Sequence, residues 1–166
     1  KKEIQRSIYH VLSGKCPANR ALVIPRAPYP HLIPATRDLS GAEIELVGEM
    51  GREYRLQETM ADLMDDYDLI FIDCPPSLGL LSINAFAMAT GALVPMQCEF
   101  LAMEGLSQLI SIVELTKRRL NRNLSIRGIV LTMYDGRSNL VRQVAEEVRN
   151  HFPELAFDTV IPRNVK

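Results

Sequence analysis

Apolar positions in the second half of the chain recur at helical spacing, and short apolar runs separate these stretches. The periodic stretches predict helices over about residues 80–89, 102–120 and 139–151. The runs between them predict strands over about residues 92–96, 126–132 and 157–161. Strands that alternate with helices form βαβ units, whose right-handed crossovers make the strands parallel. The pattern therefore predicts an α/β fold with a mostly parallel sheet flanked by helices.

The first half of the chain has a more interrupted pattern. Its periodic stretches predict helices over about residues 3–13, 38–50 and 56–64, the second one capped by Asp38 or Ser40. Two short apolar runs, residues 21–24 and 31–33, are separated by prolines. Because proline is confined to edge strands and irregular segments, these runs predict an edge hairpin or extended segments.

Residues 68–77 are expected to form the centre of the sheet. Four consecutive apolar residues, 69–72, predict a strand buried on both faces, and the prolines that follow would end it. Asp73 would then stand at the carboxyl end of a central parallel strand, where open α/β sheets place their ligands. A carboxylate there can hold Mg²⁺, usually through water, beside nucleotide phosphates. The alternative is that Asp73 only caps a turn.

Composition limits the remaining possibilities. The 166 residues are 47% hydrophobic and 23% charged, which is typical of a globular chain, and we interpret residues 1–166 as a single partial domain. The net charge of −1 provides no global basic field, so contact with nucleic acid would need a local patch. No apolar run reaches membrane-spanning length, and we expect no membrane partner. The three cysteines are widely spaced, which suits a reducing cytoplasm.

Both ends of the sequence look cut. The chain begins at Lys1 in a charged stretch without Met, and it stops at Lys166 directly after a strand-like run. We therefore interpret it as a fragment of a longer protein, truncated at both ends.

Five segments, in order, resemble the ParA/Soj-type partition ATPases, a P-loop family with a deviant Walker A motif. Residues 68–77 look like the family's Walker B segment, in which hydrophobic residues lead into Asp-x-Pro-Pro-Ser. The other matching segments are residues 31–39, 94–97 with 103–106, 131–137 and 159–165. The resemblance covers about residues 7–166 and implies a three-layer, P-loop NTPase-like fold.

The resemblance also implies an activity and a site. The parent protein would hydrolyse ATP to ADP and phosphate with Mg²⁺, and Asp73 would be the catalytic residue that holds the metal through water. The residues implied to bind the nucleotide are Thr132, Met133, Pro162, Arg163, Asn164 and Glu104. Without the family match, residues 162–164 are an ordinary strand-to-loop turn. Glu104 is implied to lie near the nucleotide or the dimer face, although the start of a helix favours a carboxylate in any case.

Two family motifs are missing from the sequence. The deviant Walker A loop, Lys-Gly-Gly-x-Gly-Lys-Thr, is absent, and so is the Asp-rich segment that positions the attacking water. In family members both precede the point where this chain begins. We therefore expect the parent to be an ATPase and the 166-residue chain alone to be inactive, because it lacks the phosphate cradle.

The resemblance further implies a role in chromosome or plasmid segregation. The parent would form an ATP-bound homodimer in the cytoplasm, associate with the nucleoid by non-specific DNA binding, and respond to a ParB-type centromere-binding partner. Within this chain the candidate DNA contacts are Arg137, Arg142 and Arg149. The last two are two turns apart on the predicted 139–151 helix, so we expect both guanidinium groups to reach solvent. The alternative for each arginine is an ordinary solvated surface.

Several other interpretations remain open. One is a nucleotide-independent scaffold that has lost its P-loop, and another is a MinD-like division-site ATPase, although that group generally carries Asp-x-Pro-Ala-Gly after Walker B. Cys74 and Cys98 suggest a relative of the nitrogenase iron protein, but its cluster-bridging cysteines lie in glycine-rich contexts, and these two are interpreted as small buried residues. A flavodoxin-like receiver domain lacks support, because no acidic cluster ends the first strand.

Overall fold

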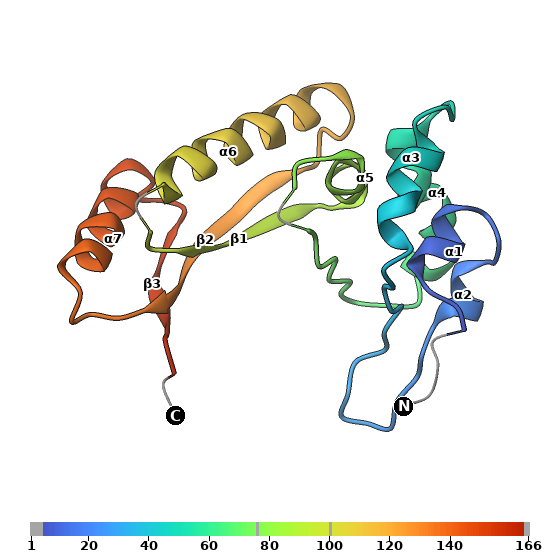
Figure 1. The fold of residues 1–166 in the computed structure, drawn as a ribbon, viewed down its shortest axis with the longest axis horizontal. Coiled ribbons are helices and arrows are strands. Elements are labelled where there is room, and N and C mark those ends of the chain that lie inside the picture. The colour runs from blue at the N-terminus through green and yellow to red at the C-terminus, as the bar shows by residue number, and fades with distance from the viewer. Residues whose placement is uncertain (1–4, 76, 100, 165–166) are drawn as a thin grey trace. The chain divides into compact units, whose positions relative to one another are not determined.

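The computed structural model describes residues 5–75, 77–99 and 101–164 (Figure 1). The chain divides into two compact units, Lys1–Met88 and Ala89–Lys166, and each is described by itself. The single partial domain expected from the sequence stays a prediction.

The first unit is built from short helices around one apolar core. Its helices are α1 (Ile8–Leu12), α2 (Ala18–Ala21), α3 (Leu39–Leu46), the 3₁₀ helix η1 (Arg52–Tyr54), α4 (Arg55–Met64) and α5 (Leu80–Met88). The predictions of α4 and α5 are confirmed, and α3 lies within the helix expected over residues 38–50 but ends at Leu46. Helix α1 covers part of the helix expected over residues 3–13, whose first two positions lie outside the described residues. The core is formed mainly by α1, α2 and α4, and Val11 is completely buried in it.

The expected hairpin is present as a single antiparallel bridge. The N–H of Val23 donates to the carbonyl of Leu32 over 2.8 Å, and the N–H of Leu32 donates back over 3.0 Å. Both side chains are about half exposed or more. The segment is therefore an extended loop held at one point.

The prediction of a strand over residues 69–72 is wrong. These residues have no ladder pairing with any described residue, and a segment without ladder hydrogen bonds is not a strand. Ile70 and Ile72 pack against the core of the first unit, whereas Leu69 and Phe71 are 67% and 81% exposed. The segment keeps the two-residue alternation of an extended chain, but only one of its faces is covered.

The second unit contains the sheet. Its strands are β1 (Gly91–Gln97), β2 (Ser125–Tyr134) and β3 (Ala156–Pro162), and its helices are α6 (Ala102–Arg119) and α7 (Asn139–His151). The strand order is β1-β2-β3, and both pairs are parallel. All five elements match those predicted from the apolar pattern. The predicted parallel sheet flanked by helices is therefore confirmed (Figure 1).

One face of this sheet carries the core. Along β1, Val94 and Met96 are buried while the residues between and beside them are exposed. Ile129 and Leu131 of β2 are completely buried, and they pack with apolar residues of both α6 and α7. The two helices therefore pack on the same face of the sheet. Among the described residues, no helix has the length and apolar character needed to cross a membrane.

Candidate functional site at the carboxyl edge of the sheet

The carboxyl ends of the three strands meet at one edge. Gln97 at the end of β1 pairs with Thr132, and Tyr134 at the end of β2 pairs with Pro162. The backbone N–H of Arg163 donates to the carbonyl of Tyr134 over 3.1 Å, which continues the contact beyond β3. Parallel α/β sheets place their ligands at this edge.

Apart from Glu104, the residues predicted to bind the nucleotide come together there. Thr132 and Met133 lie near the end of β2, and residues 162–164 follow at the end of β3. The hydroxyl of Thr132 donates to the carbonyl of Met96 on β1 over 3.4 Å. Pro162, Arg163 and Asn164 are exposed. The structure thus gathers these residues at one edge, while their contact with a nucleotide stays a prediction.

Met133 has an unusual backbone conformation. Its φ of 51° lies in the left-handed region, which non-glycine residues adopt rarely. The ladder shifts register between Leu131 and Tyr134, where this residue lies, and the Met133 side chain is 47% exposed. Such conformations cost free energy and persist only where the surrounding structure holds them, and they cluster at active sites and ligand-binding sites. Nothing in the sequence around Met133 indicates this conformation.

Sequence reasoning missed the acidic residue at this edge. Asp135 follows β2, and its carboxylate accepts two hydrogen bonds from the Arg137 guanidinium, from Nε over 2.9 Å and from Nη2 over 2.8 Å. The Arg137 backbone N–H donates as well, over 3.1 Å. These bonds, with a smaller contribution from Arg163, lower the pKa of Asp135 to about 2. The Asp-Gly-Arg sequence, typical of a turn in which Asp bonds the backbone two residues on, was the available signal.

Glu104 lies in the first turn of α6 and is exposed. A groove of about 340 Å³ runs between β1 and the start of α6, and its wall includes Gln97, Glu99, Leu101 and Gly105. Glu104 is not among the residues that line this groove. Its predicted role at a nucleotide or dimer face has no support from a contact in the structure.

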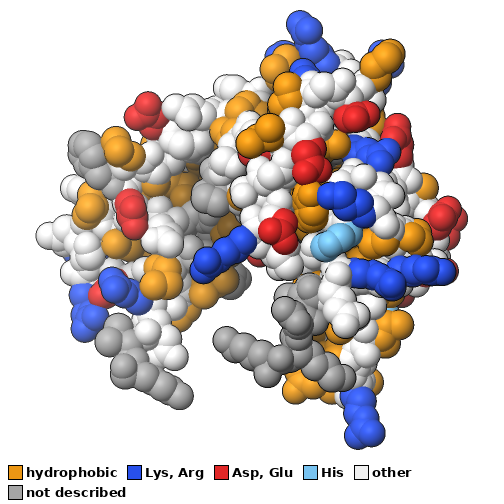
Figure 2. Space-filling model, turned by 45° about the vertical axis from the view of Figure 1, so that its right-hand side comes forward, with side chains coloured by type: hydrophobic (Ala, Val, Ile, Leu, Met, Phe, Trp, Pro, Cys, Tyr) orange, Lys and Arg blue, Asp and Glu red, His pale blue; other side chains and the backbone are white. Residues whose placement is uncertain are grey.

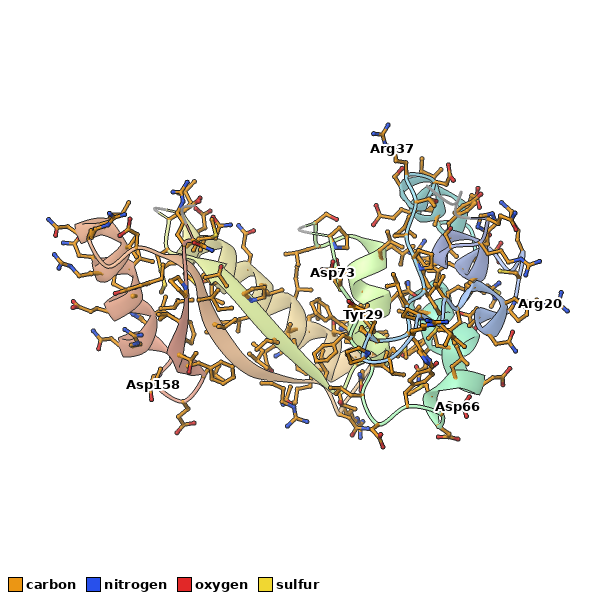
Figure 3. All side chains as sticks on the ribbon, turned by 90° about the horizontal axis from the view of Figure 1, so that it is seen from below. Arg20, Tyr29, Arg37, Asp66, Asp73 and Asp158 are labelled. Carbon is orange, nitrogen blue, oxygen red and sulfur yellow. The ribbon has the colours of Figure 1, made fainter. Side chains whose placement is uncertain are left out.

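Asp73 belongs to the first unit, whereas the other predicted site residues belong to the second. It is exposed on the extended segment that leads to α5, where Figure 3 labels it. No described group donates a hydrogen bond to its carboxylate. The neighbouring Cys74 is exposed, so its interpretation as a small buried residue is wrong, whereas Cys98 is buried as expected. The pKa of the Cys74 thiol is raised, chiefly through partial desolvation and to a smaller extent through the charge of Asp73.

A magnesium ion fits the chemistry of Asp73. Nucleotide-bound Mg²⁺ is usually held by one or two carboxylates, several waters and the phosphates themselves. The described residues contain no cluster of three or more His, Cys, Asp or Glu side chains, so they form no metal cage of their own. The exposed carboxylate of Asp73 is therefore suited to hold a metal that arrives with a nucleotide.

The three candidate DNA-binding arginines differ in their surroundings. Arg137 has an 85% exposed side chain but is bound to Asp135 through Nε and Nη2, one edge of its guanidinium group. Arg142 on α7 is exposed and donates to the side chain of Asn139. Arg149 is half-buried, and its charge lowers the pKa of the Cys98 thiol against the larger effect of burial. Arg149 is thus less exposed than Arg142, and the expectation that its guanidinium group reaches solvent stays a prediction.

Comparison with known proteins assigns the family. A family model described as "AAA domain" matches residues 1–126. The chain is 47% identical over 163 residues to the chromosome partitioning protein ParA of Myxococcus xanthus, covering 98% of this chain and 58% of that protein. It is 44% identical over 166 residues to the sporulation initiation inhibitor protein Soj of Bacillus subtilis, covering 100% of this chain and 66% of that protein. The chain belongs to the ParA/Soj-type family.

Solved structures confirm the P-loop NTPase-like fold. A structure named cobyrinic acid a,c-diamide synthase from Mycobacterium smegmatis, with bound ADP and magnesium, is 37% identical with a TM-score of 0.88, and the match covers 98% of this chain and 66% of that one. The Cyanothece McdA(D38A)–ATP complex has a TM-score of 0.87 at 19% identity, covering 99% and 65%, and shows the fold alone. The chain thus spans less than two thirds of the length of these relatives.

Proposed function

We propose that the full-length protein is an ATPase that segregates DNA. The observation that carries this proposal is the 44–47% identity to proteins named ParA and Soj, over essentially the whole of this chain. The lower identity of 37% to the structure named cobyrinic acid a,c-diamide synthase favours partitioning over amide synthesis. That structure holds ADP and magnesium, which supports a magnesium-nucleotide site in this fold.

In this proposal water attacks the γ-phosphorus of ATP, the bond to the ADP oxygen breaks, and phosphate leaves. Asp73 would hold Mg²⁺ through a water, and the bound ion would supply positive charge beside the phosphates. Thr132, Met133, Pro162, Arg163 and Asn164 contact the base. The 166 residues contain no P-loop motif, so the phosphate cradle has to come from other residues, and the chain by itself does not hydrolyse ATP.

We also propose the partners that this function requires. The ATP-bound protein forms a homodimer, binds DNA without sequence preference in the cytoplasm, on the nucleoid, and is regulated by a ParB-type protein. The names of the relatives support a role in chromosome partitioning. The exposed Arg142 supplies one cation for phosphate contact on the second unit.

The experiment is Asp73→Asn in the full-length protein, measured by phosphate release with saturating Mg–ATP. Loss of the metal-holding carboxylate should lower kcat by roughly a hundredfold or more, which corresponds to about 3 kcal/mol of transition-state stabilisation. Asp66→Asn is the matched control, because Asp66 is also an exposed carboxylate of the first unit. Equal turnover in the two variants would refute the role of Asp73.

A second measurement separates the ATPase from a nucleotide-independent scaffold. Calorimetric titration of the full-length protein with Mg–ATP should give saturable binding. Asn164→Ala should reduce the preference for ATP over GTP, because Asn164 is exposed beside the end of β3. Absence of nucleotide binding to the full-length protein would favour the scaffold.

A further inference from the structure

The start of α5 is held by a carboxylate from another helix. The side chain of Glu43, on α3, accepts a hydrogen bond from the backbone N–H of Leu81 over 3.3 Å. The first N–H groups of a helix have no acceptor within the helix, and the helix dipole favours a negative charge beside them. Glu43 therefore caps α5 although it lies 38 positions earlier in the sequence.

The loop before α5 leaves room for this carboxylate. A Cβ atom at Gly79 would collide with the same Glu43 oxygen that accepts the hydrogen bond from Leu81. Gly79 has no positive φ, so its backbone conformation does not require glycine. Glycine also allows another group to approach the backbone closely. We therefore attribute Gly79 to the close approach of Glu43.

Glu43 makes this contact in place of an ion pair. Charged side chains of both signs cover the face of the first unit that Figure 2 shows. Glu43 is half-buried on α3, and no ion pair joins it to any of the described residues. Its contact with the start of α5 therefore gives the carboxylate a defined partner.

The same loop is also tied to α5 by its own hydrogen bonds. The hydroxyl of Ser82, which is 2% exposed, donates to the carbonyl of Ser77. The N–H of Ile83 donates to the carbonyl of Gly79 over 3.1 Å. Asp73 precedes Ser77 by only four positions. Because no described group donates to the Asp73 carboxylate, its placement depends on the segment that leads into α5.

We propose that Glu43 is a positioning residue for Asp73. By capping the first turn of α5, the Glu43 carboxylate fixes the loop that follows Asp73, and thereby the place at which Asp73 meets the magnesium ion of a bound nucleotide. Glu43 itself touches neither metal nor nucleotide. This inference rests on the role of Asp73 in the proposed function.

The test measures phosphate release by the full-length protein with Mg–ATP. Glu43→Ala should lower kcat at least about tenfold with an unchanged KM for ATP, because displacing a catalytic group costs rate even when the altered residue lies outside the site. Glu43→Gln keeps an acceptor oxygen and should retain most of the rate. Gly79→Ala should reproduce the loss, since it displaces the same carboxylate.

Glu45→Ala is the matched control. Glu45 is another glutamate of α3, but it accepts its hydrogen bond from the hydroxyl of Tyr9 over 2.8 Å. Its removal should leave kcat at the wild-type value, even where it lowers the thermal stability as much as Glu43→Ala does.

Hydrogen exchange without nucleotide provides a readout that does not depend on turnover. The Leu81 amide should exchange at least about tenfold faster in Glu43→Ala than in the wild-type protein or in Glu45→Ala, because it has lost its acceptor. Unchanged exchange at Leu81 would show that Glu43 does not hold the start of α5, and would overturn the proposal.

The kinetic results separate this inference from the proposed function. Wild-type kcat in Glu43→Ala, together with loss of turnover in Asp73→Asn, would overturn the role of Glu43 alone. Equal turnover of Asp73→Asn and the wild-type protein would refute the role of Asp73 and this inference with it. A fall in kcat that Glu45→Ala shares would show that α3 only stabilises the fold, which also contradicts the proposal.

Discussion

The side-chain oxygen of Asn84 on α5 accepts a hydrogen bond from the backbone N–H of Leu56, in the first turn of α4, over 2.9 Å. The amide nitrogen of Asn84 donates to the carbonyls of Arg52 and Leu80 over 2.8 and 3.0 Å. Asn84 is 1% exposed. One buried side chain therefore joins α5, α4 and η1, directly after the segment that carries Asp73.

Asn84→Leu should destabilise the protein by about 2–3 kcal/mol, because it leaves the buried Leu56 N–H and two carbonyls without their partner. Urea denaturation followed by circular dichroism measures this change. Asn150→Leu is a suitable control, because Asn150 is exposed on α7. A loss below about 0.5 kcal/mol for Asn84→Leu would mean that water replaces the amide.

Gly79 and Glu43 should be energetically coupled. The Glu43 carboxylate accepts a hydrogen bond from the backbone N–H of Leu81 over 3.3 Å, and a Cβ at Gly79 would collide with the same carboxylate oxygen. Gly79→Ala should therefore displace Glu43 and cost about 1 kcal/mol. In a Glu43→Ala background the same change should cost almost nothing. A double-mutant cycle measures the coupling, and additive losses would show that the two residues act independently.

The ionisation of Asp135 should depend on Arg137. The pKa of Asp135 is lowered from 3.8 to about 2, first through its hydrogen bonds with Arg137. Because the folded-state pKa is below the unfolded value, the resulting stabilisation is present above about pH 4 and is lost as the pH falls through about 2. Carboxyl NMR titration should show this pKa, and Arg137→Gln should return it towards 3.8. Arg142→Gln should leave it unchanged, and an equal shift in both variants would contradict the pairing.

The second unit could be predicted well because its pattern is local. The apolar spacing along residues 139–151 is that of a helix with one buried face, and Val144, Ala145 and Val148 form that face. The predicted strand β1 needed only β2 as a partner for its ladder hydrogen bonds, and β2 lies in the same unit. Here local propensity and tertiary packing favour the same structure.

The segment before Asp73 could not be predicted in the same way. Residues 69–72 have strand-like composition, but a strand also needs ladder partners, and no described residue supplies them. The site at the sheet edge was predicted in part. The meeting of residues 132–134 with residues 162–163 follows from parallel topology. The positive φ of Met133 and the bidentate Asp135–Arg137 pair depend on backbone geometry that sequence spacing does not specify.

Among the candidate DNA contacts, Arg142 should contribute most. Arg137 is engaged by Asp135 and Arg149 is half-buried. Arg142 is exposed, and among the described residues it donates to the neutral side chain of Asn139. Arg142→Glu should weaken DNA binding of the ATP-loaded full-length protein equally on unrelated sequences. The slope of log affinity against log salt should fall by about one unit, since each phosphate contact releases about one counterion.

Adding Arg149→Glu to Arg142→Glu should weaken DNA binding less than Arg142→Glu itself does, because Arg149 is the less exposed of the two residues. Arg122→Glu provides the matched charge reversal, since Arg122 is an exposed arginine of the same unit, in the loop between α6 and β2. If Arg122→Glu and Arg142→Glu reduce affinity and salt slope equally, the effect is one of net charge. If only Arg142→Glu does so, the start of α7 belongs to the DNA-binding face.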